Sequence, residues 1–169
     1  MSNSFDRIQK NFGFGFMRLP LKDGEINLDE DKVLTFEDGL IGFENCKRYT
    51  ILYNNEEGGN NTISWLQSLD MQELALPVIS PLSVMADYNP IVEDEVLQPL
   101  GGLTEENVII LLTLSVPSDI TKMTANLKAP LIINADTKKG CQIIAENPDY
   151  VVKYNIYELV KKSKEAKGE

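Results

Sequence analysis

Apolar and polar residues alternate along the stretch 122–145, and this pattern organises the interpretation of the whole chain. Because successive side chains of a strand point to opposite faces, the alternation predicts a strand buried on one side. The turn residues 136–140, in which Gly140 is free to take a positive φ, separate it from a second alternation, and this pattern is typical of a β-hairpin. Pro130 cannot donate a ladder hydrogen bond, so it predicts an edge, a bulge or a break between two shorter strands. The face predicted to be buried comprises Met123, Ala125, Leu127, Ala129, Leu131 and Ile133. The second alternation places Cys141, Ile143 and Ala145 on one face.

Short apolar runs bounded by turn residues predict further strands along the chain. The first run begins at Arg18, and Asp23-Gly24 after it is a hairpin signal. The segment 35–43, with two glycines among apolar residues, predicts a loop whose side chains tuck inward. Trp65, the one tryptophan, is expected to anchor the core. The other expected strands span residues 25–28, 32–36, 49–53, 63–68, 75–80 and 108–116.

Two segments are predicted to form helices. Residues 92–100 carry Glu93, Asp94 and Glu95 in the first turn, where carboxylates complement the helix dipole, and Gly101-Gly102 follows as a stop. Residues 150–164 predict a terminal helix whose basic end suits the negative pole of the dipole. In that helix we expect the apolar side chains to face the body of the protein: Val151, Tyr154, Leu159 and Val160.

Seven to nine short strands without βαβ alternation indicate a mainly β protein, an antiparallel barrel or sandwich with short helices. The 169 residues suit one domain. We expect a flexible N-terminal extension over residues 1–16, a single β domain over 17–150, and a C-terminal helix with a lysine-rich tail over 151–169.

The net charge of −10 argues against direct binding of nucleic acid and favours a basic protein partner, although solubility alone would also explain it. The charge is uneven: residues 152–169 hold five lysines and three glutamates, a net of +2, which leaves −12 for residues 1–151. Cys46 and Cys141 form no motif, and no apolar run has the length of a membrane span or a signal segment, so a cytoplasmic protein is expected. The chain has no histidine, which removes the commonest general base and metal ligand, and no cofactor or metal is expected.

Four motifs occur in order: residues 33–44 (VLTFEDGLIGFE), 65–70 (WLQSLD), Asp87-Tyr88 before an acidic helix, and 123–134 (MTANLKAPLIIN). Together they resemble the bacterial flagellar assembly factor FliW over about residues 17–145. Glu37 and Ile41 stand where the family pattern often has proline, which predicts a less rigid loop here.

The resemblance implies a small β-barrel-like body with short helices and a non-enzymatic function. FliW-like proteins bind the translational repressor CsrA, which relieves its repression of flagellin synthesis, and they also bind flagellin, so the two partners exchange. Two alternatives stay open. One is a structural or chaperone-like flagellin-binding protein without CsrA antagonism, and the other is a β-barrel enzyme that uses carboxylates such as Asp87 and Glu93.

The candidate partner-binding residues are polar or aromatic groups in these motifs that we expect to be exposed. For Asp70 and Asp87, turn or helix-cap chemistry is the competing interpretation. For Asn126, hydrogen bonds to the backbone of an edge strand compete with a contact to a partner. The candidates are Asp70, Asp87, Tyr88, Glu93, Asp94, Thr124, Asn126 and Lys128.

Overall fold

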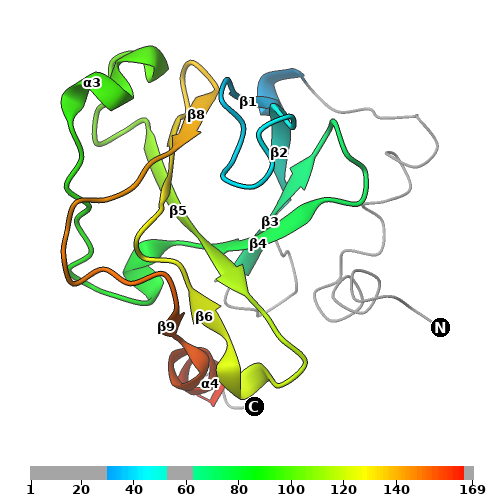
Figure 1. Ribbon diagram of the computed structural model, residues 1–169, viewed down its shortest axis with the longest axis vertical. Coiled ribbons are helices and arrows are strands. Elements are labelled where there is room, and N and C mark those ends of the chain that lie inside the picture. Colours follow the sequence, from blue (N-terminus) through cyan, green and yellow to red (C-terminus); the bar gives the residue numbers. More distant parts are fainter. Residues whose placement is uncertain (1–29, 53–62, 166–169) are drawn as a thin grey trace.

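A computed structural model describes residues 30–52 and 63–165 and contains a closed seven-stranded β-barrel (Figure 1). The barrel closes in the order β4-β3-β2-β1-β8-β7-β5 and back to β4; β1 and β8 pair in parallel and the other neighbours are antiparallel. Its strands are β1 (Leu34–Phe36), β2 (Arg48–Leu52), β3 (Ile63–Ser68), β4 (Ala75–Ile79), β5 (Val108–Ser115), β7 (Leu131–Asn134) and β8 (Lys139–Gln142). The predicted fold class is confirmed.

A small annex extends the sheet beyond β5. β6 (Thr124–Ala125) pairs with the end of β5, and β9 (Tyr154–Asn155) pairs with β6. Figure 1 shows these two strands together with the terminal helix α4 (Tyr157–Glu165) at the lower end of the molecule. The predicted strands at residues 18–28 and the predicted extension 1–16 lie outside the described residues.

The ladder between β4 and β5 is short, and its last pair joins Val78 to Thr113. The next residue of β4 is Pro77, which has no N–H to donate to β5, so the ladder ends there. Beyond this point β5 pairs with β6 along its other edge, the edge that also pairs with β7. The barrel wall therefore opens between β4 and the end of β5.

The stretch 122–145 is not one strand, because extra residues separate its two halves. Leu111 of β5 lies opposite Leu131, and Leu114 lies opposite Ala125. β5 advances by three residues between these pairs (111 to 114) while its partner advances by six (125 to 131), so three residues are extra. An odd number of extra residues turns the following side chains to the opposite face of the sheet. The predicted break near Pro130 is confirmed, whereas the prediction of a single shared face is wrong.

The predicted buried residues of this stretch are all buried from Met123 to Ile133, but, apart from Ala129, they are divided between two different cores. One core takes alternate residues of the closed barrel and fills its interior: Leu34, Phe36, Tyr49, Leu66, Val78, Leu131 and Ile133, with Leu40, Cys46 and Leu74. The other lies outside the barrel wall, under the connecting segments: Tyr88, Leu100, Leu112, Leu114, Met123, Ala125, Leu127, Ile132, Ile143, Tyr150 and Ile156 are among its members. Trp65, 2% exposed, is buried as predicted.

Gly140 serves packing rather than turn geometry: it does not take the positive φ that glycine is free to adopt in the turn. In the turn before β8 the left-handed residue is Lys138, with φ 62°. A Cβ on Gly140 would lie 2.7 Å from Cζ of Phe36 and 3.1 Å from Cγ1 of Ile133. Gly140 is therefore the position at which β8 makes room for the Phe36 ring in the barrel interior.

The helices are shorter than the pattern predicts. α3 covers Asp94–Leu97 and continues as the 3-10 turn η3 (Gln98–Leu100), which ends at Gly101 with φ 90° as predicted. α4 begins at Tyr157 and not at residue 150, because residues 154–155 pair with β6 and Asn155 Oδ1 then accepts a hydrogen bond from the Tyr157 N–H. Val151 and Leu159 are exposed, so the expectation that they face the body is wrong. The other short turns are η1 (Glu30–Lys32), η2 (Pro81–Ser83) and η4 (Ile120–Lys122).

None of the helices within residues 30–52 and 63–165 is long and apolar enough to span a membrane.

Candidate functional site

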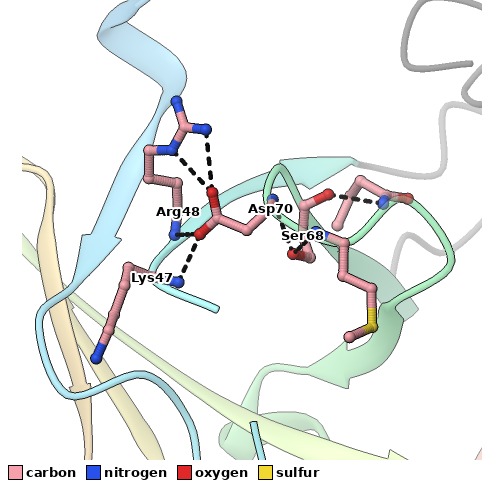
Figure 2. A network of polar contacts seen from close by, with 6 residues as sticks. Lys47, Arg48, Ser68 and Asp70 are labelled. Carbon is pink, nitrogen blue, oxygen red and sulfur yellow. Dashed lines mark hydrogen bonds and ion pairs between the residues drawn. The ribbon is translucent and has the colours of Figure 1, made fainter. Parts of the chain in front are cut away.

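Asp70 organises the start of β2 (Figure 2). Its Oδ2 accepts hydrogen bonds from the backbone N–H groups of Lys47, at 2.7 Å, and Arg48, at 2.9 Å. Its Oδ1 accepts from Arg48 Nε and forms an ion pair with the same guanidinium, both at 3.0 Å. The hydroxyl of Ser68 accepts from the N–H groups of Asp70 and Met71 and holds the turn that carries the carboxylate. Turn chemistry therefore engages Asp70, as the competing interpretation predicted.

These contacts also set the titration of Asp70. Burial by itself would raise the pKa of this carboxyl, but the backbone N–H groups of Arg48 and Lys47 and the Arg48 guanidinium outweigh it, and the pKa lies below its ordinary value. Asp70 is therefore ionised at neutral pH, and its negative charge is matched within the fold by Arg48.

Tyr88 is a core residue, so the expectation that it is exposed is wrong. Its hydroxyl donates a 2.8 Å hydrogen bond to the carbonyl of Leu127, and its ring stacks on Tyr150 with the centroids 4.7 Å apart. Burial raises the pKa of Tyr88 above its ordinary value, so the hydroxyl remains a donor. Asp87, the residue before it, is exposed.

Asn147 connects the candidate segments, although sequence reasoning did not single it out. Its Oδ1 accepts from the Ile91 N–H at 2.6 Å, and its Nδ2 donates to the carbonyl of Asn89 at 3.0 Å. Its own carbonyl accepts from Nζ of Lys128 at 3.1 Å. The available signal was the Asn-Pro dipeptide, which marks turns and occurs at both 89–90 and 147–148.

Asn126 and its neighbours hold the extra residues between β6 and β7. The Asn126 Oδ1 accepts from the N–H groups of Lys128 and Ala129, both at 3.0 Å, as in an Asx turn. The carbonyl of Ala129 accepts from Gln142 Nε2 at 3.0 Å. The Asn126 side chain therefore satisfies the backbone, as the competing interpretation predicted. Thr124 is half-buried in β6.

The acidic residues at the start of α3 are, together with Asp87, the candidates whose side chains are exposed. Glu93, Asp94 and Glu95 are exposed, and Glu93 makes no side-chain cap on this helix. Figure 1 shows α3 at one corner of the molecule, at the same end as β1 and β8. Carboxylates that are free at one corner can pair with lysine or arginine of another protein.

A hollow of about 130 Å³ separates α3 from the loop after β1. Val96 and Pro99 line it on the side of α3 and η3, and Glu37 and Asp38 line it on the side of the loop. Half-buried Lys139 of β8 also lines it, as the one cation among its lining residues. We call Glu37, Asp38, Glu93, Asp94 and Glu95 the acidic face. Sequence reasoning missed Glu37 and Asp38, because only the pairing of β1 with β8 brings their loop near α3.

Cys141 lies beside this hollow as a half-buried free thiol. Burial and the nearby Asp38 carboxylate raise the pKa of Cys141 to about 11, so the thiol is protonated at neutral pH. Within the described ranges, no three carboxylate or cysteine side chains are grouped so that they could hold a metal ion.

Comparison with known proteins gives one consistent result. A family model described as FliW protein matches residues 21–156. A protein named flagellar assembly factor FliW from Lachnoclostridium phytofermentans is 61% identical over 135 residues, which cover 80% of this chain and 86% of that protein. Its namesake from Lachnospira eligens is 51% identical over 140 residues, 82% and 93% of the two chains.

The fold agrees with these matches. A crystal structure of a flagellar assembly factor FliW superposes with a TM-score of 0.70 at 29% sequence identity. The superposition covers 78% of this chain and 89% of the other.

Proposed function

Because this chain belongs to the FliW family of flagellar assembly factors, we propose that it acts by binding two proteins, CsrA and flagellin. Bound to CsrA, it antagonises this translational repressor and relieves the repression of flagellin synthesis. Bound to flagellin, it is unavailable to CsrA, so the exchange of partners couples flagellin level to translation. The protein acts without catalysis, in the cytoplasm, where both partners are made. The observation that carries the proposal is the match to the family over residues 21–156.

The distribution of charge supports a basic protein as one partner. The acidic face collects five exposed carboxylates from two segments, and the chain as a whole has a net charge of −10. A repressor that binds RNA must present a basic surface, since phosphates require one. Charge complementarity between two proteins raises the rate of association and favours the correct partner.

Titration tests the proposal directly. Labelled CsrA and labelled flagellin are each titrated with the purified protein, and each complex is then challenged with the other partner. We expect saturable binding of both and displacement of CsrA by flagellin. Binding of flagellin alone would replace the proposal with a flagellin-binding chaperone that does not antagonise CsrA. Binding of neither would refute it.

The rate of association with CsrA tests whether charge complementarity contributes to binding. Stopped-flow mixing with CsrA at about 0.05 M and about 0.5 M salt spans a range over which the Debye length falls severalfold. We expect association to slow at high salt while dissociation changes less. Equal association rates would assign the acidity to solubility.

A further inference from the structure

The turn after β1 has a backbone that only glycine can adopt. Leu40 and Phe43 form an isolated antiparallel bridge, and the Phe43 N–H donates to the Leu40 carbonyl at 2.8 Å. Gly39 has φ 68°, and a Cβ there would lie 2.6 Å from the backbone oxygen of Glu44. Gly42 has φ 91°, the positive value that the third residue of a type II turn takes. The turn 40–43 is thus closed tightly by its own backbone.

Two side chains hold the tip of this turn. The Ile41 N–H donates to Gln142 Oε1 at 2.8 Å, and the Gly42 N–H donates to Glu44 Oε2 at 3.0 Å. Gln142 also donates through Nε2 to the carbonyl of Ala129, so it ties the turn to β8 and to the segment before β7. A proline at position 41 has no N–H and could not make the bond to Gln142. The predicted loss of rigidity at Ile41 is therefore offset by this hydrogen bond.

The turn displays an apolar side chain. Ile41 is 57% exposed, whereas Leu40 beside it is 2% exposed, so the prediction that this loop tucks its side chains inward holds for Leu40 and fails for Ile41. A single exposed isoleucine is ordinary on a protein surface. This one is unusual because hydrogen bonds at its own N–H and at the next residue hold its backbone in place, which lowers the entropy lost when it docks.

A hollow of about 210 Å³ lies beside Ile41. It occupies the opening in the barrel wall where Pro77 ends the ladder between β4 and β5. Its lining is mixed: Phe43, Leu76 and Leu114 are apolar, and Thr113, Asn126 and Gln142 are polar. Its volume is large enough for one aliphatic side chain of another protein.

The carboxylates around the turn 40–43 favour a positively charged partner. Residues 37–46 include Glu37, Asp38 and Glu44 and no lysine or arginine. The next residue is Lys47, whose Nζ donates to the backbone carbonyl of Glu37 at 3.0 Å, so the segment with Lys47 keeps a net charge of −2. All three carboxylates are exposed, and none forms an ion pair with another residue in the described part of the chain. The Gly42 N–H holds the pKa of Glu44 below its ordinary value, so this group is ionised at neutral pH. A segment that carries lysine or arginine beside an aliphatic side chain is complementary to this surface.

We propose that the turn 40–43 and the adjoining hollow form the docking surface for the basic partner, with Ile41 as the apolar anchor and Gln142 as the residue that positions it. This inference rests on the proposed function and makes it specific, since CsrA is the basic one of the two partners. The partner inserts an aliphatic side chain beside Ile41 and places its cationic groups against Glu37, Asp38 and Glu44.

Calorimetric titration of purified CsrA into full-length variants tests the proposal. Ile41→Ser should weaken binding by about tenfold or more, as loss of a central apolar anchor does. Ile120→Ser is the matched control, because Ile120 is 52% exposed in η4, beside the annex at the other end of the barrel. The affinity of this variant for CsrA should stay within about twofold of wild type. Melting curves confirm that both variants are folded.

Gln142→Ala tests the positioning role through a double-mutant cycle. Gln142→Ala alone should weaken CsrA binding and speed hydrogen exchange at the Ile41 amide. In the Ile41→Ser background, the same substitution should cause little further loss of CsrA affinity. Additive losses would overturn the positioning role. Ile41→Lys, compared with Ile120→Lys, places a cation among the three carboxylates and should reduce CsrA binding further.

The outcomes separate the two hypotheses. If wild type binds CsrA and Ile41→Ser binds equally well, the docking surface is wrong and the proposed function stands. If Ile41→Ser loses flagellin and keeps CsrA, the assignment to the basic partner is wrong. If wild type itself does not bind CsrA, the proposed function fails, and this inference fails with it.

Discussion

The hydroxyl of Tyr88 donates a hydrogen bond to the backbone carbonyl of Leu127, 2.8 Å away and 39 residues along the chain. Both residues are buried, and the Leu127 N–H donates in turn to the carbonyl of Val151 at 2.9 Å. This bond joins the segment after η2 to the extra residues between β6 and β7. It gives Tyr88 a structural role that can be measured apart from any role in binding.

Replacing Tyr88 with phenylalanine should destabilise the protein by about 1–2 kcal/mol, because the buried carbonyl of Leu127 loses its donor while ring packing is kept. Urea unfolding measures the change. Tyr154→Phe is the control, since that hydroxyl makes no hydrogen bond to another described residue. CsrA affinity should be unchanged in Tyr88→Phe, and a loss of affinity with unchanged stability would contradict the structural role.

Replacing Gly140 with alanine should cost about 1–3 kcal/mol, because the new methyl group would overlap the Phe36 ring 2.7 Å away. Gly102→Ala is the matched control: nothing lies within 4 Å of its Cβ position. Denaturant midpoints compare the two variants. Equal stability of both would show that the barrel interior accommodates a methyl group at position 140.

Replacing Asp70 with asparagine should destabilise the fold by about 1–2 kcal/mol at neutral pH, since an amide presents a donor toward donors and removes the charge that faces Arg48. The folded pKa of Asp70 is depressed, so its stabilisation is fully present above the unfolded pKa and is lost as pH falls through the folded value. The difference between wild type and Asp70→Asn should therefore shrink below about pH 4. Urea unfolding from pH 7 to pH 3 measures it, and a constant difference would argue against the carboxylate as its source.

Neutralising α3 should affect binding more than folding. Glu93→Gln with Asp94→Asn should lower CsrA affinity by about threefold or more, with flagellin binding less affected, because two charges of the acidic face are removed. The expected stability loss is about 1 kcal/mol or less, the size of an exposed dipole effect. Glu73→Gln with Glu158→Gln, exposed outside the acidic face, is the control of equal charge. Unchanged CsrA affinity would leave α3 with its dipole role alone.

The local pattern of the sequence predicted most strands and their limits. Residues 63–68 form a strand as predicted, Trp65 is buried, and the helix at α3 ends at Gly101. The four motifs were enough to indicate the family. These features depend on side-chain alternation, turn residues and backbone chemistry within a few residues, which are present in the sequence itself.

Tertiary structure decided which core each strand face enters and which candidates are exposed. The three extra residues before β7 reverse its faces, and only the pairing with β5 reveals them. Tyr88 is buried because Leu127 and Tyr150 meet it from distant segments, and Gly140 stays small because Phe36 arrives across the β1–β8 pairing. Ile41 is exposed, and its backbone N–H is held by Gln142, which is 101 residues away in the sequence. Periodicity is a local property, whereas burial at these positions depends on partners that the closed barrel brings together from far along the chain.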